Sequence, residues 1–134
     1  MRATAILATT ATFISHAAVA DVKRREFIPE SLRGSWAPTT EVCKNADKSI
    51  IAISAKTYTS SEANCTVVWV SETAAARGPI YSAHLQCVSR MGGPQTLSNL
   101  ILRQNGTDQI SVGADFPSLK AFWRCAADES TTKR

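Results

Sequence analysis

Four cysteines are the feature that most limits what this chain can fold into. They stand at positions 43, 65, 87 and 125, and none lies close enough to another to form the short pairs that zinc sites use. An even set of well-separated cysteines is typical of a disulfide framework in an exported protein, with a four-cysteine metal site as the lesser alternative. Two bridges also suit a chain of 134 residues, whose single core supplies only modest stability.

Residues 1–20 have the make-up of a secretory signal peptide. A positive start at Arg2 is followed by a weakly apolar stretch and by Ala18, Val19 and Ala20, the small residues that a signal peptidase recognises. We therefore expect export to a bacterial periplasm or out of the cell, although an amphipathic helix that stays attached is the alternative. After the signal we expect a flexible N-terminal arm at 21–31, a β-barrel domain at 32–126 and a polar tail at 127–134.

The rest of the chain reads as a series of short strands. Turn-forming residues separate segments rich in valine, isoleucine, tryptophan, tyrosine and threonine, and no segment shows sustained helical periodicity. The sequence therefore predicts an all-β fold, a small antiparallel meander barrel or sandwich of about seven to eight strands, stapled by two disulfides. The expected strands are 33–38, 49–54, 65–72, 80–89, 96–104, 108–113 and 119–126, with a further one near 56–59.

Alternation of apolar and polar residues predicts both the inner face and the disulfide pairing. In the expected strands 80–89 and 119–126, the cysteine falls on the face that carries the apolar residues. Of the three possible pairings we favour the hairpin bridge Cys65–Cys87, between directly opposed residues, together with Cys43–Cys125. This hairpin register would also set Val67 against Leu85, Trp69 against Ala83 and Ser71 against Tyr81, with all six side chains facing inward. In the last strand, alternation predicts that Leu119, Ala121 and Trp123 face inward as well.

A second hairpin is predicted around Asn105-Gly106, because both positions tolerate a positive φ. A two-residue turn there would set Ile101 opposite Ile110 and Asn99 opposite Val112. Leu100 and Leu102 would then face outward, as Phe122 would on the last strand, and together they would form an exposed apolar patch of the kind that marks partner sites. Cover by the N-terminal arm, through Phe27 and Ile28, is the equal alternative.

The sequence Gly34-Ser35-Trp36 resembles the opening strand of lipocalin-like (calycin) barrels, a group that includes small exported inhibitors of bacterial metalloproteases. The resemblance implies a closed antiparallel barrel in which Trp36 closes one end of the core. Two features depart from those inhibitors. They carry one disulfide rather than two, and their inhibitory N-terminal trunk has no residue-by-residue match in 21–31.

A second stretch, Gly78-Pro79-Ile80-Tyr81, resembles the Ser-Gly-x-x-Tyr element that bacterial inhibitors of C-type lysozymes insert into their target, with Arg77 in the place of the serine. The resemblance implies a contact loop on the hairpin that the Cys65–Cys87 bridge would hold at its base. The candidate binding loop is therefore Arg77, Gly78, Pro79 and Tyr81.

Nothing in the sequence points to catalysis. Beyond residue 20 the chain contains one histidine, His84, and no nucleophile elbow, metalloprotease motif or phosphate-binding glycine loop. The net charge of +4 includes no basic stripe of the nucleic-acid-binding kind, and no apolar run reaches the roughly 18 residues of a membrane-spanning helix. We therefore expect no enzyme, cofactor or metal, and a hydrolase dependent on His84 is the weakest hypothesis.

The expected function is that of an exported, non-catalytic binding module, an inhibitor-like protein that presents loops on a rigid barrel to a protein partner. Two alternatives remain at this stage. One is a structural envelope protein that packs through the apolar patch and associates weakly with the envelope. The other is a carrier of a small apolar ligand, held in a cavity lined by Trp36, Trp69 and Trp123.

Overall fold

The computed structural model describes residues 11–12, 22–44 and 48–126, so that the expected signal peptide, apart from residues 11–12, and the expected polar tail lie outside the described residues. Strands dominate the described chain, with two short 3-10 helices. The strands are β1 (Val22–Arg25), β2 (Gly34–Ala37), β3 (Ile51–Ile53), β4 (Thr57–Thr59), β5 (Ala63–Thr73), β6 (Ile80–Ser89), β7 (Thr96–Gln104), β8 (Gln109–Gly113) and β9 (Lys120–Arg124); the 3-10 helices are η1 (Glu30–Leu32) and η2 (Val42–Lys44).

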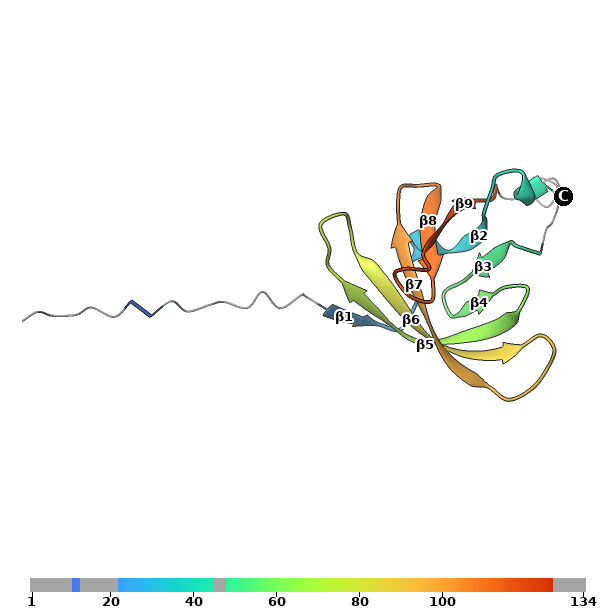
Figure 1. Cartoon of the computed structure of the whole chain (residues 1–134), viewed down its shortest axis with the longest axis horizontal. Coiled ribbons are helices and arrows are strands. Elements are labelled where there is room, and N and C mark those ends of the chain that lie inside the picture. The colour runs from blue at the N-terminus through green and yellow to red at the C-terminus, as the bar shows by residue number, and fades with distance from the viewer. Residues whose placement is uncertain (1–10, 13–21, 45–47, 127–134) are drawn as a thin grey trace, which may run out of the picture.

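Strands β2 to β9 form a closed antiparallel barrel (Figure 1). Each strand pairs with the next along the chain, and β9 returns to pair with β2 through Trp36 and Arg124, which closes the circle. The expected all-β meander fold is confirmed, and the architecture is a barrel rather than a sandwich. The β5–β6 and β6–β7 hairpins extend to opposite sides of the barrel (Figure 1).

Alternating side chains fill the barrel interior, as the pattern of β6 predicts. Along β6 the buried positions are Tyr81, Ala83, Leu85 and Cys87, and the residues between them are partly exposed. A period of two is what a strand with one face on the core requires. The other buried apolar residues of the core are Ile28, Leu32, Trp36, Ile51, Ile53, Cys65, Val67, Val70, Leu100, Leu102, Ile110 and Val112.

The register between β5 and β6 changes at a β-bulge, which the sequence analysis did not foresee. Val67 lies opposite Leu85 as predicted, but Val68 is an extra residue, and Trp69 lies opposite His84 rather than Ala83. A bulge moves every later residue to the other face of the strand. Val70 therefore takes the inner position opposite Ala83 and is fully buried, whereas Trp69 is not among the buried residues.

The β7–β8 hairpin also differs from the prediction. Leu102 pairs with Val112 and Gln104 with Ile110, and Asn105 N–H donates to the carbonyl of Gln109, so that the connection is longer than a two-residue turn. The altered register turns the expected outer patch inward. Leu102 is completely buried, Leu100 is 7% exposed, and Phe122 packs against the core. The apolar patch predicted from Leu100, Leu102 and Phe122 is therefore wrong.

Strand β9 is likewise turned relative to the prediction. Phe122 faces the core opposite the buried Ile110, and Arg124 lies beside Trp36, so the even-numbered residues point inward. Trp123, on the opposite parity, is only partly buried. Because the barrel closes through β9, its inner face is decided by the long-range pairing with β2 and β8 rather than by its own alternation.

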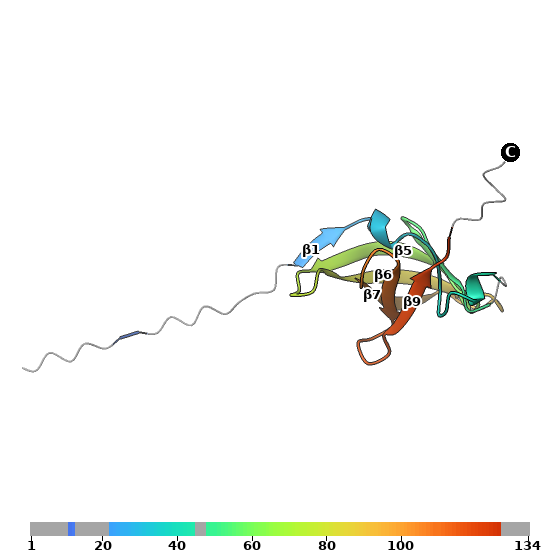
Figure 2. The same ribbon diagram turned by 90° about the horizontal axis from the view of Figure 1, so that it is seen from above.

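The expected flexible arm is instead part of the folded domain over its described residues. β1 pairs with the last four residues of β5, beyond the stretch of β5 that β4 covers. Past β1 the chain crosses the barrel end, where Ile28 N–H donates to Ala55 O at 2.9 Å and the side chains of Ile28 and Leu32 are fully buried. Figure 2 shows β1 and η1 along one side of the barrel.

Both predicted disulfides are confirmed. Cys65 and Cys87 are directly opposed on β5 and β6 with Cα atoms 4.0 Å apart, and both are buried. Cys43 joins Cys125 with Cα atoms 5.4 Å apart and is closer to the surface. The second bridge therefore ties the β2–β3 connection to the end of β9. Two disulfides are consistent with an oxidising environment outside the cytosol.

Candidate functional site

One end of the barrel is closed by a tryptophan and an arginine. Trp36 is fully buried, and its indole Nε1 donates to Leu32 O at 3.0 Å. The guanidinium of Arg124 lies 4.2 Å from the centre of the Trp36 ring and donates to the carbonyls of Arg33 and Ser31 at 2.8 and 2.9 Å. The same guanidinium approaches Gly34 so closely that a Cβ there would stand 2.9 Å from it. Ligands therefore cannot enter from this end.

The other end holds a pocket of about 520 Å³, which we call the cup. Its apolar floor is made by the barrel core, and its polar rim comes from the connections between the strands. A mostly apolar cavity with a few polar groups at its mouth is the usual form of a ligand site. The floor contains Leu85, Leu100, Val112 and Phe122, and Cys65 and Cys87 belong to the wall; the rim contains Ser60, Glu62, Thr96, Ser98, Ser118 and Lys120.

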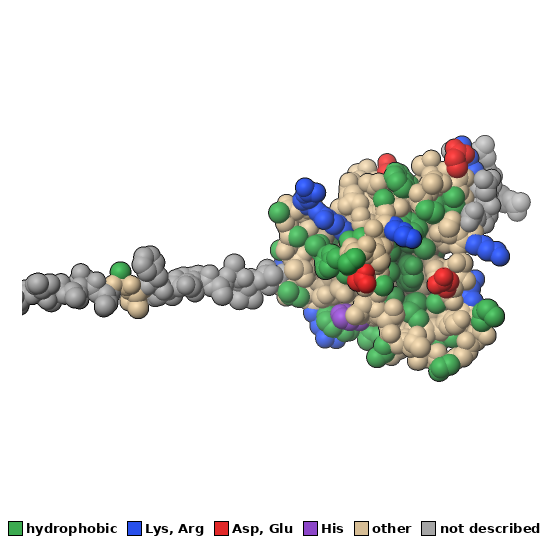
Figure 3. Space-filling view, viewed as in Figure 1, with side chains coloured by type: hydrophobic (Ala, Val, Ile, Leu, Met, Phe, Trp, Pro, Cys, Tyr) green, Lys and Arg blue, Asp and Glu red, His purple; other side chains and the backbone are tan. Residues whose placement is uncertain are grey.

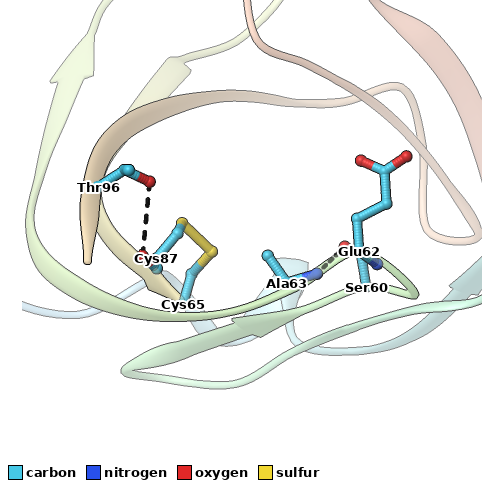
Figure 4. Close-up of a disulfide and its surroundings, with 6 residues drawn as sticks. All are labelled: Ser60, Glu62, Ala63, Cys65, Cys87 and Thr96. Carbon is cyan, nitrogen blue, oxygen red and sulfur yellow. Dashed lines mark hydrogen bonds between the residues drawn. A yellow bond between two sulfur atoms is a disulfide. The ribbon is translucent and has the colours of Figure 1, made fainter. Parts of the chain in front are cut away.

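The Cys65–Cys87 disulfide stands at the wall of the cup (Figure 4). Thr96 lies on one side of it and donates its hydroxyl to Cys87 O at 3.5 Å, whereas the Glu62 carboxylate lies on the other side (Figure 4). The disulfide joins the two strands that bound this wall. The bridge therefore holds β5 and β6 together at the wall of the cup.

The electrostatics of the cup are mild. Burial, reinforced by the negative charge of Glu62, raises the pKa of the Tyr58 phenol, which therefore stays neutral at physiological pH. Glu62 and Lys120 contribute one charge of each sign to the rim. Figure 3 likewise shows acidic and basic side chains scattered among hydrophobic ones on the visible face rather than gathered by sign. The cup thus suits an apolar group better than an ion.

The predicted binding loop is divided by the structure. Arg77 and Pro79 are exposed in the β5–β6 connection, and Gly78 adopts a positive φ of 105° that favours glycine there. Tyr81 is buried on β6, and its hydroxyl donates to Glu72 Oε1 at 3.0 Å. Tyr81 is therefore not at the loop surface, and the structure groups it instead with the base of the hairpin.

That base is held by an ion pair. Arg25 Nε of β1 donates to Glu72 Oε2 at 3.0 Å, and this hydrogen bond holds the pKa of the Glu72 carboxyl below its usual value. A smaller pocket of about 210 Å³ lies here, between β1 and the loop. Strand β1 and Glu72 thus brace the hairpin that carries Arg77, a support that the sequence analysis missed because it treated residues 21–31 as a flexible arm.

Outside the barrel, the bulge creates an aromatic stack. Trp69 and His84 lie with ring centres 3.8 Å apart, and Arg24 of β1 covers Trp69 at 4.4 Å. The stack borders a shallow groove of about 410 Å³ that also includes the exposed side chains of Val68 and Leu97. We call this the outer groove. The outer groove depends on the bulge at Val68, and no pattern in the sequence predicts a bulge at that residue.

The three tryptophans do not line one cavity. Trp36 closes the barrel end, Trp69 lies in the outer groove, and Trp123 pairs with Ala37 and Gln109 at the β2–β9–β8 seam. None of them contributes to the cup. The expectation of a ligand cavity lined by Trp36, Trp69 and Trp123 is therefore wrong, and any small ligand would meet the cup instead.

The described residues contain no group of three or more histidine, cysteine, aspartate or glutamate side chains placed to hold a metal ion. In the same part of the chain, no helix is both long and apolar enough to span a membrane. Comparison with known proteins returned no matching family model, curated protein or solved structure. The geometry of the barrel is therefore the basis for inferring what the protein does.

Proposed function

We propose that the protein is an exported, non-catalytic binding module of the lipocalin-like kind, which takes an apolar group of its partner into the cup. The observation that carries the proposal is the contrast between the two barrel ends. Trp36 and Arg124 close one end, whereas the other holds a pocket of about 520 Å³ with an apolar floor. The Gly34-Ser35-Trp36 sequence supports the lipocalin-like assignment, because Trp36 occupies the place that this resemblance implies.

Binding of the apolar dye Nile red tests the cup. We expect saturable dye fluorescence that is lost when Lys120→Phe fills the mouth from β9, because Lys120 is exposed and lines the cup but not the outer groove. Thr66→Phe is the matched control, since Thr66 is exposed on β5 and lies outside the cup. Equal dye binding by the two variants would show that the dye binds elsewhere and would remove the support for the cup.

A second function, presentation of the β5–β6 loop to a protein, is favoured by the bracing of that hairpin. β1, Glu72 and Arg25 hold its base, and Arg77 is exposed beyond it. A braced loop binds with less loss of conformational entropy than a free one. Capture of the partner with the intact protein, followed by Arg77→Glu and Arg77→Lys, tests this function. Loss of the partner with glutamate but not with lysine is expected, and equal retention by both variants would argue against it.

A further inference from the structure

Part of β7 lacks a neighbour on one side. β7 pairs with β6 from Thr96 to Arg103, but β8 pairs only with residues 101–104. Past Gly113 the chain leaves β7 for the connection to β9, and no backbone hydrogen bond of the described residues joins 96–100 to anything but β6. The barrel therefore has a free strand edge, five residues long, at the end that holds the cup.

The hydrogen-bonding groups at this edge follow from the register. Asn105 N–H donates to Gln109 O, across from it on the β8 side. Backbone groups of successive residues in a strand point to alternate sides. The N–H and C=O groups of Leu97 and Asn99 therefore point to the free side, whereas those of Ser98 and Leu100 point to β6. Two donors and two acceptors are thus available to an added strand.

This edge carries neither charge nor proline, two of the devices that usually prevent strand addition. Natural edge strands are protected by charge, by proline or by being short. β1, which ends the sheet beside β5, fits that rule, since three of its four residues are basic. The sequence of 96–100 is Thr-Leu-Ser-Asn-Leu, without charge or proline, and Leu97 is 82% exposed. An unprotected edge of this kind favours pairing with another chain.

Both hollows of this region border the same edge. From β7, Thr96 and Leu100 line the cup, Leu97 lines the outer groove, and Ser98 and Asn99 border both. Side chains of an added strand would alternate between these two hollows. Residues of one parity would enter the apolar cup, and those of the other parity would lie over Leu97 and the Trp69–His84 stack.

We propose that the free edge of β7 binds an extended peptide segment of a partner protein by strand addition, with apolar side chains at alternate positions directed into the cup. The inference rests on the proposed function and names the chemistry of the partner. Backbone pairing supplies affinity in this mode, and the pockets for alternate side chains supply specificity. A second copy of this chain is a poorer occupant than a peptide. Its β7 is paired with β6 and would enter as two strands, whereas Ala114, Ser118 and Lys120 limit the width of the cup on the side away from β7.

Amide hydrogen exchange measured by NMR tests the edge in the free, disulfide-bonded protein. We expect the amide protons of Leu97 and Asn99 to exchange rapidly and those of Ser98 and Leu100 slowly. Addition of a soluble heptapeptide of alternating valine and threonine, with lysine at each end, should slow exchange at Leu97 and Asn99. Slow exchange at both positions in the free monomer would overturn the inference, as would concentration-dependent dimerisation that protects them.

Proline substitution then separates backbone pairing from side-chain contact. Leu97→Pro removes an N–H that points to the free side and should leave the β6 pairing intact, because proline is tolerated at that side of an edge strand. We expect it to weaken peptide binding about tenfold, the equivalent of one lost hydrogen bond, and Leu97→Ala to have a smaller effect. Equal weakening by the two variants, with unchanged thermal stability, would contradict strand addition.

The two proposals fail in different ways. If Nile red enters the cup and Lys120→Phe blocks it, but the peptide does not bind, strand addition is wrong and the apolar cup stands. If the peptide binds along Leu97 and Asn99 while Lys120→Phe leaves the dye unaffected, the edge stands as a pairing site and the cup is not where the dye binds. If neither probe binds, both proposals are wrong.

Discussion

Removal of the Arg124 side chain should destabilise the protein through the closed end of the barrel. The Arg124 side chain donates to the backbone carbonyls of Arg33 and Ser31, makes a longer contact of 3.4 Å with that of Thr107, and stacks on the ring of Trp36. The two short hydrogen bonds of this partly exposed cation and its cation–π contact are together worth about 3 kcal/mol, and the long hydrogen bond to Thr107 O adds little. With an m-value of about 1.5 kcal/mol per molar urea, the midpoint of unfolding of Arg124→Ala should fall by about 2 M.

Equilibrium urea unfolding, followed by tryptophan fluorescence and by circular dichroism, measures this change. Arg90→Ala is the matched control, because the Arg90 side chain donates to one carbonyl, Ser60 O at 2.7 Å, and stacks on no aromatic ring among the described residues. We expect that control to lose less than about 1 kcal/mol. Arg124→Lys should keep about half of the stabilisation, since an ammonium cannot reach both carbonyls in a fork. A loss no greater for Arg124→Ala than for Arg90→Ala would refute the role of this contact in closing the barrel.

Three further predictions concern the core, the disulfides and pH. Leu102→Ala should lower the free energy of unfolding, measured in denaturant, by about 2–5 kcal/mol, because Leu102 is fully buried. If Leu102 faced solvent, the same substitution would leave the free energy of unfolding almost unchanged. Replacing Cys43 and Cys125 with alanine should lower stability by about 4.5 kcal/mol, against about 3.4 for the other bridge, because the closed loop spans 82 residues rather than 22. The hydrogen bond from Arg25 lowers the pKa of Glu72 in the folded state. The stabilisation from this ion pair should therefore be fully present above the ordinary pKa of 4.5 and be lost as the pH falls through the lowered pKa. Urea unfolding of Glu72→Gln, measured over the same pH range, should lack this pH dependence.

Each of these three has a result that would contradict it. An unchanged midpoint for Leu102→Ala would mean that this leucine faces solvent, as the two-residue turn predicted. A smaller loss for the 82-residue bridge than for the 22-residue one would contradict the loop-length argument. Identical pH profiles for wild type and Glu72→Gln would mean that the ion pair contributes nothing to folding.

Much of the fold was open to prediction because its signals are local. Turn residues and a period of two located eight strands of the barrel to within a few residues, including 80–89 and 96–104 with the observed bounds. The alternation of β6 placed Cys87 inside, and that position led to both disulfides. These features depend on neighbouring residues in the chain, which the sequence displays directly.

The strands at the ends of the chain were harder to predict. Residues 22–25 form β1 only because β4 leaves the end of β5 unpaired, and their basic sequence carries no strand pattern. Arg124 reads as an outward charge in the alternation of the last strand. It lies over Trp36 because closure of the barrel brings β9 to β2. Neither the pairing of β1 nor the position of Arg124 follows from neighbouring residues in the sequence.

The sequence by itself determined the all-β class and the eight strands of the barrel and favoured the observed disulfide partners, whereas the tertiary structure decided the registers and the pairing of β1. One extra residue at Val68 sent Trp69 outward, and a longer β7–β8 connection turned Leu100 and Leu102 inward despite the Asn105-Gly106 turn signal. A shift of one residue exchanges the two faces of a strand, and the burial of the whole barrel chooses between them. The outer groove and the free edge of β7 both follow from those choices, which is why only the folded chain reveals them.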